Sequence, residues 1–439
     1  MAEPRFVSTF APVFSGLAML PDPIRRVPIP RDLDSVASIG AEVDATDVGL
    51  PADYPQRIWR RMRWLYRSGV HPAIQVCIRR RGAVVFDRAL GHARGNGPGE
   101  APGTPVVPVT TDTRFAAYSA SKGVMAFVVH LLVERGLVEL DAPVARYIPE
   151  YGCLGKESIT IGQVLSHRAG VAWLPRHALE PAAVGDRDLL VRNLCAVRPA
   201  TTPGKYQAYH ALSGGFILGE VVHRVTGKDL RTVLIEEILD PLGFTATNYG
   251  ATPDEIPALA RNYLTGLNVP PMTTMVERII GVSLADAVEA GNGPAHLGIL
   301  APAANLVTTA HELSRFYEIF RRGGELDGVR IMRPETVAAA LVPQSRIEPD
   351  LMLGVNAGFG YGHMLGGRLV NLFGPDTRLA FGHHGFTSIA AWADPERALS
   401  VAVMTSGKVI LHPELNRFFG LLWGITAETP KVPESELYF

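Results

Sequence analysis

Strand-like segments lie near both ends of this chain, whereas helical patterns fill its middle. Residues 74–89 are typical of a β-hairpin, and residues 388–392 and 399–405 form a second pair of strand-like runs joined by a turn. Between residues 119 and 345, apolar residues recur at helical spacing and are divided by proline and glycine. We therefore expect an α/β (α+β) fold in which the two ends of the chain build one antiparallel sheet, flanked by helices, with a mostly helical lobe inserted between them.

This pattern divides the 439 residues into three parts. A chain of this length exceeds what one simple core usually spans, so we expect two lobes rather than a string of independent modules. The expected parts are an extended N-terminal arm at 1–52, a sheet-containing lobe formed by 53–118 and 372–439, and a mostly helical lobe at 119–371.

Three shorter patterns complete the sheet-containing lobe. Residues 56–67 place apolar side chains at helical spacing with arginines between them, which predicts a core helix with a solvated arginine face. A membrane-surface helix is the alternative, but a single short basic face binds membranes only weakly. We also expect a glycine- and proline-rich loop at 91–108 and a final helix near 414–422.

The composition is that of an ordinary soluble globular protein. Hydrophobic residues make up 47% of the chain, charged residues 19%, and the formal net charge is −1, so no large positive field would attract nucleic acid. The chain has no stretch of about 20 apolar residues that would give stable membrane insertion. Residues 6–20 are largely apolar, but Glu3 precedes them, Pro12 interrupts them and no small-residue cleavage site precedes Pro21, so a secretory signal is not expected.

Cysteine usage fits a reducing compartment. Cys77, Cys153 and Cys195 leave at least one thiol unpaired and show no C-x-x-C spacing, so neither a disulfide framework nor a zinc knuckle is supported. We therefore expect a cytoplasmic protein. A homo-oligomer is compatible with the sequence, which leaves the oligomeric state open.

The chain contains one S-x-x-K, formed by Ser119 and Lys122 at the start of its clearest helical segment, which ends at Gly136. Residues three apart share one face of a helix, about 5 to 6 Å apart at Cβ, so the lysine amine can take the proton of the serine hydroxyl. With 17 serines and six lysines in 439 residues, about 0.23 such matches would arise by chance. A solvent-exposed pair is the alternative, and the scarcity of lysine makes each of the six worth inspecting.

Two further segments carry candidate chemistry. Tyr209 immediately precedes an apolar helical segment, where it can face the Ser/Lys pair and act as general base and then acid. Residues 381–386 open a strand pair, and their glycines let a backbone N–H approach a substrate as part of an oxyanion hole. The alternatives are simple packing for Tyr209 and a metal site at His383 and His384, which lack a third ligand at regular spacing.

In order and spacing these elements resemble the three motifs of serine β-lactamases, penicillin-binding proteins and the class C β-lactamase-like carboxylesterases of family VIII: S-x-x-K, Y-x-N or a variant, and K-T-G or H-x-G. Supporting stretches lie at 136–144, 159–170 and 393–396. The resemblance covers residues 55–425 and implies the β-lactamase/transpeptidase-like fold. No G-x-S-x-G is present, so the nucleophile elbow of an α/β-hydrolase is not expected.

The resemblance implies a role for each matching residue of the first two motifs. Ser119 corresponds to the acylated nucleophile, Lys122 to its proton acceptor or electrostatic support, and Tyr209 to the general base. His167 lies in a segment whose counterpart is structural, and His210 is interpreted as a hydrogen-bonded structural histidine.

The third motif supplies the remaining expected contacts. The resemblance implies an oxyanion hole formed by the backbone N–H groups of Ser119 and Phe386, with His383 and Gly385 on the substrate-binding strand. His383 stands where the motif's lysine would be, and Ala211 replaces the asparagine of the second motif. No cofactor and no metal are implied.

These two departures favour esters over β-lactams or peptides. The leading hypothesis is a serine carboxylesterase that cleaves small or medium esters through a Ser119 acyl-enzyme, with acyl transfer to an alcohol or amine as a close variant. A β-lactamase or D-alanyl-D-alanine peptidase is the alternative. An alternative of another class is a catalytically inactive binding protein on the same fold, against which the intact Ser119, Lys122 and Tyr209 argue.

Overall fold

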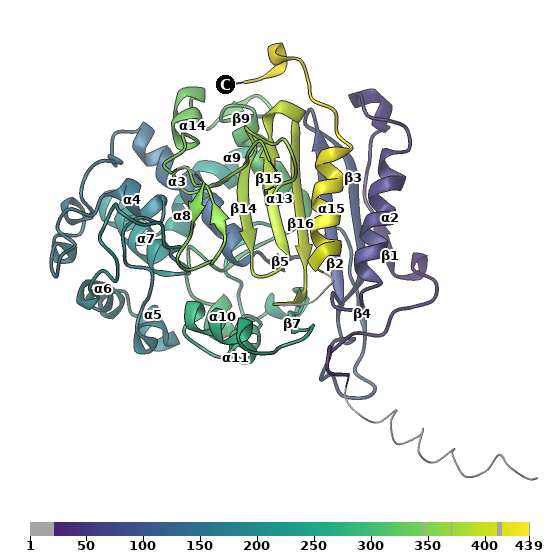
Figure 1. Cartoon of the computed structure of the whole chain (residues 1–439), viewed down its shortest axis with the longest axis horizontal. Coiled ribbons are helices and arrows are strands. Elements are labelled where there is room, and N and C mark those ends of the chain that lie inside the picture. The colour runs from purple at the N-terminus through teal and green to yellow at the C-terminus, as the bar shows by residue number, and fades with distance from the viewer. Residues whose placement is uncertain (1–21, 346, 370, 411–414, 439) are drawn as a thin grey trace, which may run out of the picture.

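The computed structural model describes residues 22–345, 347–369, 371–410 and 415–438, so the apolar segment at 6–20 lies outside the described residues. Its centre is an eight-stranded sheet with the strand order β1-β3-β2-β16-β15-β14-β13, in which β4 pairs with β3 (Figure 1). Every neighbouring pair in this sheet is antiparallel. The two ends of the chain therefore meet in one sheet, and the expected fold class is confirmed.

The strands of the main sheet come from two stretches of the chain. They are β1 (Ala37–Ile39), β2 (Ala73–Arg80), β3 (Ala83–Arg94), β4 (Val107–Pro108), β13 (Met364–Leu365), β14 (Phe381–Gly385), β15 (Ile389–Asp394) and β16 (Leu399–Thr405). Short strands form small sheets elsewhere: β5 (Phe115–Ala116) with β8 (Leu306–Thr308) and β6 (Asn248–Tyr249), β7 (Tyr263–Leu264) with β17 (Gly407–Lys408), β9 (Glu325–Leu326) with β10 (Val329–Arg330), and β11 (Glu348–Pro349) with β12 (Asn356–Ala357).

Helices fill most of the middle of the chain. They are α2 (Tyr54–Tyr66), α3 (Ser121–Glu134), α4 (Ile161–Leu165), α5 (Pro181–Gly185), α6 (Arg187–Ala196), α7 (Ser213–Thr226), α8 (Leu230–Leu234), α9 (Asp240–Leu242), α10 (Met272–Ile280), α11 (Leu284–Ala290), α12 (Pro294–Leu297), α13 (Ala310–Arg321), α14 (Pro334–Ala340) and α15 (Leu415–Ala427). Within the described part of the chain, none of these is both long and apolar enough to cross a membrane.

Helices cover both faces of the sheet, which explains why its strands are buried on both sides. Helices α2 and α15 pack together on one face, and α13 packs on the other (Figure 1). Successive side chains of a strand point to opposite faces, so Cys77, Ala391 and Ala402 join the core under α13. Val76 and Trp392 join the core under α2 and α15. The sheet therefore has a separate apolar layer on each face.

Long-range pairing corrects one local expectation. The helix expected at 56–67 and the two expected strand pairs are confirmed. The loop expected at 91–108 is wrong at both ends, because β3 continues to Arg94 and β4 pairs with it. Glycine and proline mark the loop locally, but the antiparallel partner extends the strand.

Residues 22–52 lie along the edge of the sheet. There β1 pairs with β3, and Val27, Leu33, Val48 and Leu50 are buried. This segment therefore adds a strand and apolar contacts to the body. The predicted division into an arm and two lobes stays a prediction.

Candidate active site

A buried helix begins directly at the S-x-x-K pair. Tyr118–Ala120 form one 3-10 turn that leads into α3. Helix α3 is apolar on all sides and is buried over nearly its whole length, so it belongs to the core. Ser119 stays half-buried, whereas Lys122 is 2% exposed. A solvent-exposed Ser/Lys pair, the alternative left open by the motif alone, is therefore not what the fold contains.

The amine of Lys122 has three hydrogen-bond acceptors. Its Nζ donates to the Ser119 hydroxyl oxygen at 3.2 Å and to the carbonyl oxygens of Ala211 and Ala303 at 2.8 and 3.1 Å. It also lies 4.8 Å from the centre of the Tyr209 ring. Burial lowers the pKa of Lys122 to about 7.

This arrangement suits proton transfer from Ser119 to Lys122. An ammonium group donates three hydrogen bonds, whereas a neutral amine has two N–H donors and one lone pair. The carbonyls of Ala211 and Ala303 can only accept, so they take the two N–H groups of the neutral amine. The lone pair is then left for the proton of the Ser119 hydroxyl.

Ser121, the other hydroxyl of the motif, is fully occupied. Its Oγ donates to the carbonyl of Tyr118 and accepts from the backbone N–H of Leu306 at 3.0 Å. Its own carbonyl accepts from the Tyr249 phenol at 2.8 Å, and the residue is fully buried. Ser121 therefore joins the start of α3 to its surroundings and does not face the cavity that Ser119 lines.

Tyr209 lines the same cavity as Ser119. Burial raises the pKa of the Tyr209 phenol, and a hydrogen bond with the Ser119 side chain opposes that rise only partly. The backbone N–H of Tyr209 donates to Asp350 Oδ1 at 3.1 Å. The structure thus brings Ser119, Lys122 and Tyr209 together, with the phenol in its neutral, proton-donating form.

His167 and His210 lie behind Tyr209. The His167 ring is 4.6 Å from the Tyr209 ring and 4.7 Å from the Phe359 ring. Its Nδ1 accepts from the backbone N–H of His210 at 3.1 Å. Burial lowers the pKa of both histidines, so both are neutral near pH 7. His167 thus contacts both the Tyr209 ring and the backbone of the next residue. The structural roles expected for the two histidines stay predictions.

The end of β14 reaches the start of α3 because Gly385 has no side chain. A Cβ at Gly385 would lie 2.3 Å from the carbonyl oxygen of Ala117. The next residue, Phe386, packs its ring 5.7 Å from the Tyr118 ring. Ser119, Gly385 and Phe386 all line the cavity. The residues expected to supply the two oxyanion-hole N–H groups therefore face one space.

His383 is placed differently from the other members of its motif. It is fully buried and is not among the residues that line the cavity, whereas its neighbour His384 is. Its Nδ1 donates to the His384 carbonyl at 2.7 Å, and its ring is 6.1 Å from the Tyr209 ring. Burial, and then the charge of Lys122, keep the pKa of His383 well below its usual range. His383 is therefore a neutral neighbour of Tyr209 and supplies no cation.

The cavity has a volume of about 810 Å³ and predominantly apolar walls. Its lining comes from α10 and α11, and also from α15 and residues 409–410. The contribution of the C-terminal helix is not apparent in the sequence. Among the described lining residues, Glu180 and Asp286 are acidic and none is lysine or arginine.

Lys408 is a second buried lysine near the site, and motif reasoning missed it. Its Nζ donates to the Thr405 carbonyl at 2.9 Å and lies 4.7 Å from the centre of the Tyr118 ring. Burial lowers its pKa to about 7. The next N–H, that of Val409, donates to Thr387 Oγ1 at 2.8 Å. The rarity of lysine is the one sequence signal that pointed to Lys408.

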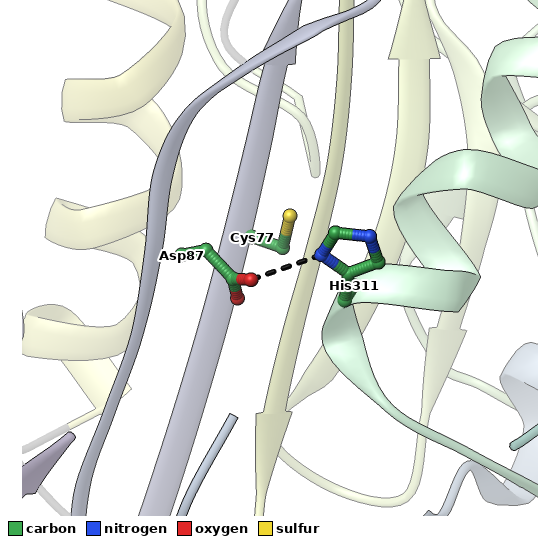
Figure 2. A group of neighbouring side chains, drawn as sticks. All are labelled: Cys77, Asp87 and His311. Carbon is green, nitrogen blue, oxygen red and sulfur yellow. Dashed lines mark hydrogen bonds and ion pairs between the residues drawn. The ribbon is translucent and has the colours of Figure 1, made fainter. Parts of the chain in front are cut away.

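One group of described residues offers three metal-ligating atoms, away from the site above. Cys77, Asp87 and His311 place these atoms within 4.8 Å of one another (Figure 2). Both ring nitrogens of His311 are already engaged, one with Asp87 at 2.9 Å and one with the Arg79 guanidinium at 2.9 Å. Burial raises the pKa of the Cys77 thiol to about 12, and the guanidinium opposes a cation. We interpret this group as a hydrogen-bonded network that joins β2, β3 and α13.

The fold and the S-x-x-K site define a serine hydrolase of the β-lactamase type. The chain belongs to the Beta-lactamase family, whose model it matches over residues 58–417. It is similar to "Esterase/beta-lactamase LipL" of Mycobacterium tuberculosis, with 32% identity over 312 residues, 68% of this chain and 70% of the relative.

Two solved structures extend the comparison. A family VIII carboxylesterase has 25% sequence identity and a TM-score of 0.71, covering 85% of this chain and 98% of that one. A penicillin-binding protein homologue from Caulobacter crescentus has 27% identity and a TM-score of 0.73, covering 87% and 99%. The family resemblance of the three motifs is thereby confirmed, and the protein is a hydrolase of this family.

The contrast between the two serines of the motif is directly testable. We expect a fluorophosphonate probe to label Ser119, because only this hydroxyl combines cavity access with the Lys122 amine. Ser119→Ala should abolish labelling and turnover. The matched control Ser121→Ala should keep both, with a loss of about 2 to 4 kcal/mol in the free energy of unfolding, because two buried backbone groups lose their hydrogen-bond partner. Mass mapping of an adduct on Ser121 would contradict this assignment.

A pH profile tests Lys122 as the proton acceptor. Because the pKa of Lys122 is lowered to about 7, its neutral form increases as pH rises through that value, and kcat/KM for an ester should rise with it. Lys122→Arg should be nearly inactive at every pH, because a guanidinium keeps its proton. Lys408→Met serves as control, since the pKa of Lys408 is also about 7. If the wild-type profile of kcat/KM against pH has its inflection near pH 7 and the Lys408→Met profile lacks it, the titrating group is Lys408 and not Lys122.

Tyr209→Phe separates proton transfer from substrate binding. We expect kcat to fall by about 10² to 10⁴ with little change in KM, because the phenol hydrogen matters in the transition state. Tyr206→Phe is the matched control, since Tyr206 lies in the same segment but is exposed. A near-normal kcat for Tyr209→Phe would reduce Tyr209 to a packing residue.

Proposed function

We propose that this protein is a carboxylesterase that works through an acyl-enzyme on Ser119. The observation that carries the proposal is the 3.2 Å hydrogen bond between Lys122 Nζ and Ser119 Oγ beside a large apolar cavity. The hydrogen bonds from Lys122 Nζ to the carbonyl oxygens of Ala211 and Ala303 hold the amine beside Ser119, where it can act as the base. Polar recognition groups are few in the cavity, which suits a neutral ester.

Acylation follows from these positions. The Ser119 oxygen attacks the ester carbonyl carbon while its proton passes to the neutral amine of Lys122. The carbonyl oxygen becomes an oxyanion and accepts hydrogen bonds from the N–H groups of Ser119 and Phe386. Collapse of this intermediate breaks the bond to the alkoxy oxygen, which takes the phenol proton of Tyr209 as the alcohol leaves. The proton held by Lys122 then passes to Tyr209, so both groups return to their starting forms. Water then repeats the sequence at the acyl carbon and releases the acid with Ser119 restored.

The pKa directions distinguish the roles of Lys122 and Tyr209. Burial lowers the pKa of Lys122 to about 7, so it can be neutral and accept a proton under physiological conditions. Burial raises the pKa of Tyr209, which disfavours a phenolate. We therefore assign the first deprotonation to Lys122 and give Tyr209 the transfer of a proton to the leaving alcohol, rather than the role of general base that its motif implies.

Acyl transfer is a variant of the same reaction. An alcohol or amine that replaces water at the acyl-enzyme yields a new ester or amide without any new catalytic group. The apolar cavity lowers the local availability of water, which favours such an acceptor. The natural acceptor then depends on the cavity walls rather than on Ser119 and Lys122.

A β-lactamase is the second candidate, because LipL carries both activities in its name. A β-lactam brings a carboxylate and an amide to be recognised. Ala211 has no side-chain group for the amide, and its carbonyl is already bound to Lys122. His383 is neutral and Asp286 carries the wrong charge for a carboxylate. The site therefore favours the ester.

The comparison of two chromogenic substrates tests this choice. An unsatisfied polar group costs about 1 to 3 kcal/mol, so the two missing partners should reduce kcat/KM for a chromogenic cephalosporin by at least about 10² relative to p-nitrophenyl butyrate. Both rates are measured at one pH on one preparation, with Ser119→Ala as the blank. Equal or faster turnover of the cephalosporin would promote the β-lactamase candidate.

A further inference from the structure

The cavity beside Ser119 is much larger than a short acyl group needs. Its volume of about 810 Å³ is that of sites enclosing drug-sized ligands, about 300 to 1,000 Å³. An acetyl or butyryl ester would leave most of the apolar wall uncovered. Building on the ester hydrolysis proposed above, we propose that the substrate is an ester with an extended, uncharged apolar chain of about eight carbons or more.

Helix α10 provides one apolar wall. Met275, Val276 and Ile279 line the cavity and are only half-buried. Thr274 and Arg278 on the same helix are exposed and do not line it. Apolar side chains that remain partly in water gain free energy when another apolar group covers them. Met275, Val276 and Ile279 therefore form an apolar stripe along α10, and this stripe suits an occupant that extends along it.

Helix α15 provides a second apolar wall. Leu415, Phe418 and Phe419 all line the cavity, and Phe419 is half-buried like the stripe on α10. Aromatic rings of this kind offer large contact areas to alkyl or aryl groups. An occupant that reaches α15 as well as α10 must extend well beyond the carbonyl held at Ser119.

Two small residues, Ala287 and Gly291, line the cavity beside Tyr118. A Cβ at Gly291 would lie 2.5 Å from the Tyr118 phenol oxygen, so a larger residue cannot fit there without displacement. Ala287, one turn earlier along α11, lines the same space. A bulky side chain at Ala287 should shorten the cavity without touching Ser119, Lys122 or Tyr209.

The charges at the cavity exclude an anionic chain. Glu180 and Asp286 are the acidic residues among the described lining, both are exposed, and no lysine or arginine accompanies them there. A carboxylate on the substrate chain would meet like charge and lose water without gaining a cationic partner. The bound chain therefore carries no anionic group, and the predominantly apolar walls favour a neutral one.

Chain-length series test the proposal on the intact protein. One series consists of p-nitrophenyl esters from acetate to dodecanoate, and the other of acetate esters from ethyl to dodecyl alcohol, each below the concentration at which it aggregates. A fully buried methylene contributes about fourfold to kcat/KM. We expect at least about 30-fold higher kcat/KM for the eight-carbon than for the two-carbon member in one series, and that series identifies the side of the ester carrying the chain.

A pair of variants on one helix supplies the control. Ala287→Phe places a ring in the cavity, whereas Ala285→Phe places it on an exposed position of α11 that does not line the cavity. Ala287→Phe should lower kcat/KM at least about tenfold for the eight-carbon substrate and change the two-carbon substrate less than about twofold. Ala285→Phe should leave both rates unchanged. If Ala287→Phe fails to fold, Val276→Trp with Thr274→Trp provides an equivalent pair.

The outcomes separate this inference from the proposed function. Rates that stay flat or fall beyond four carbons in both series, with measurable turnover of the acetates, overturn the extended-chain substrate and leave the esterase intact. Equal losses in Ala287→Phe and Ala285→Phe also overturn it. No turnover of any ester by the folded protein overturns the proposed function itself.

Discussion

The buried amine of Lys122 is the contact on which the site depends. It joins Ser119 on the first turn before α3 to the backbone of Ala211 and Ala303, two segments far away in the sequence. Burial of this amine costs solvation, and three well-placed acceptors offset that cost. The same burial lowers its pKa to about 7 and prepares it to accept a proton. The contacts that hold the middle of the chain together at Lys122 therefore also create the buried environment in which its amine can accept a proton from Ser119.

The sequence predicts what depends on local spacing. The strand patterns at the two ends predict the antiparallel sheet because alternation and turns are local properties, and the pairing of Cys77 with Ala402 joins those ends. The S-x-x-K spacing likewise places Ser119 and Lys122 on one helical face before any tertiary contact is known. The order of the three motifs identifies Tyr209 as a site candidate. In the structure it lies next to Ser119 and Lys122, which come from another part of the chain.

Burial and cavity shape could not be predicted in this way, because they arise from contacts between distant segments. His383 follows its motif in sequence, yet the sheet buries it behind the cavity wall while His384 lines the cavity. Lys408 belongs to no motif, and only the pairing of β17 with β7 and the contact with Tyr118 reveal its position. The α15 wall is likewise supplied by a helix from the other end of the chain.

The apolar surroundings of the site affect both the proposed reactivity of Ser119 and the choice between charged and neutral substrates. A low-dielectric site destabilises the ammonium form of Lys122 and strengthens hydrogen bonds from backbone N–H groups to a developing oxyanion. The same surroundings penalise any substrate charge that lacks a partner, and among the described lining residues none is lysine or arginine. A cation placed there to hold a carboxylate would also repel the protonated lysine and lower its pKa further. The proposed selection for a neutral substrate thus follows from the same electrostatic environment that we propose activates Ser119.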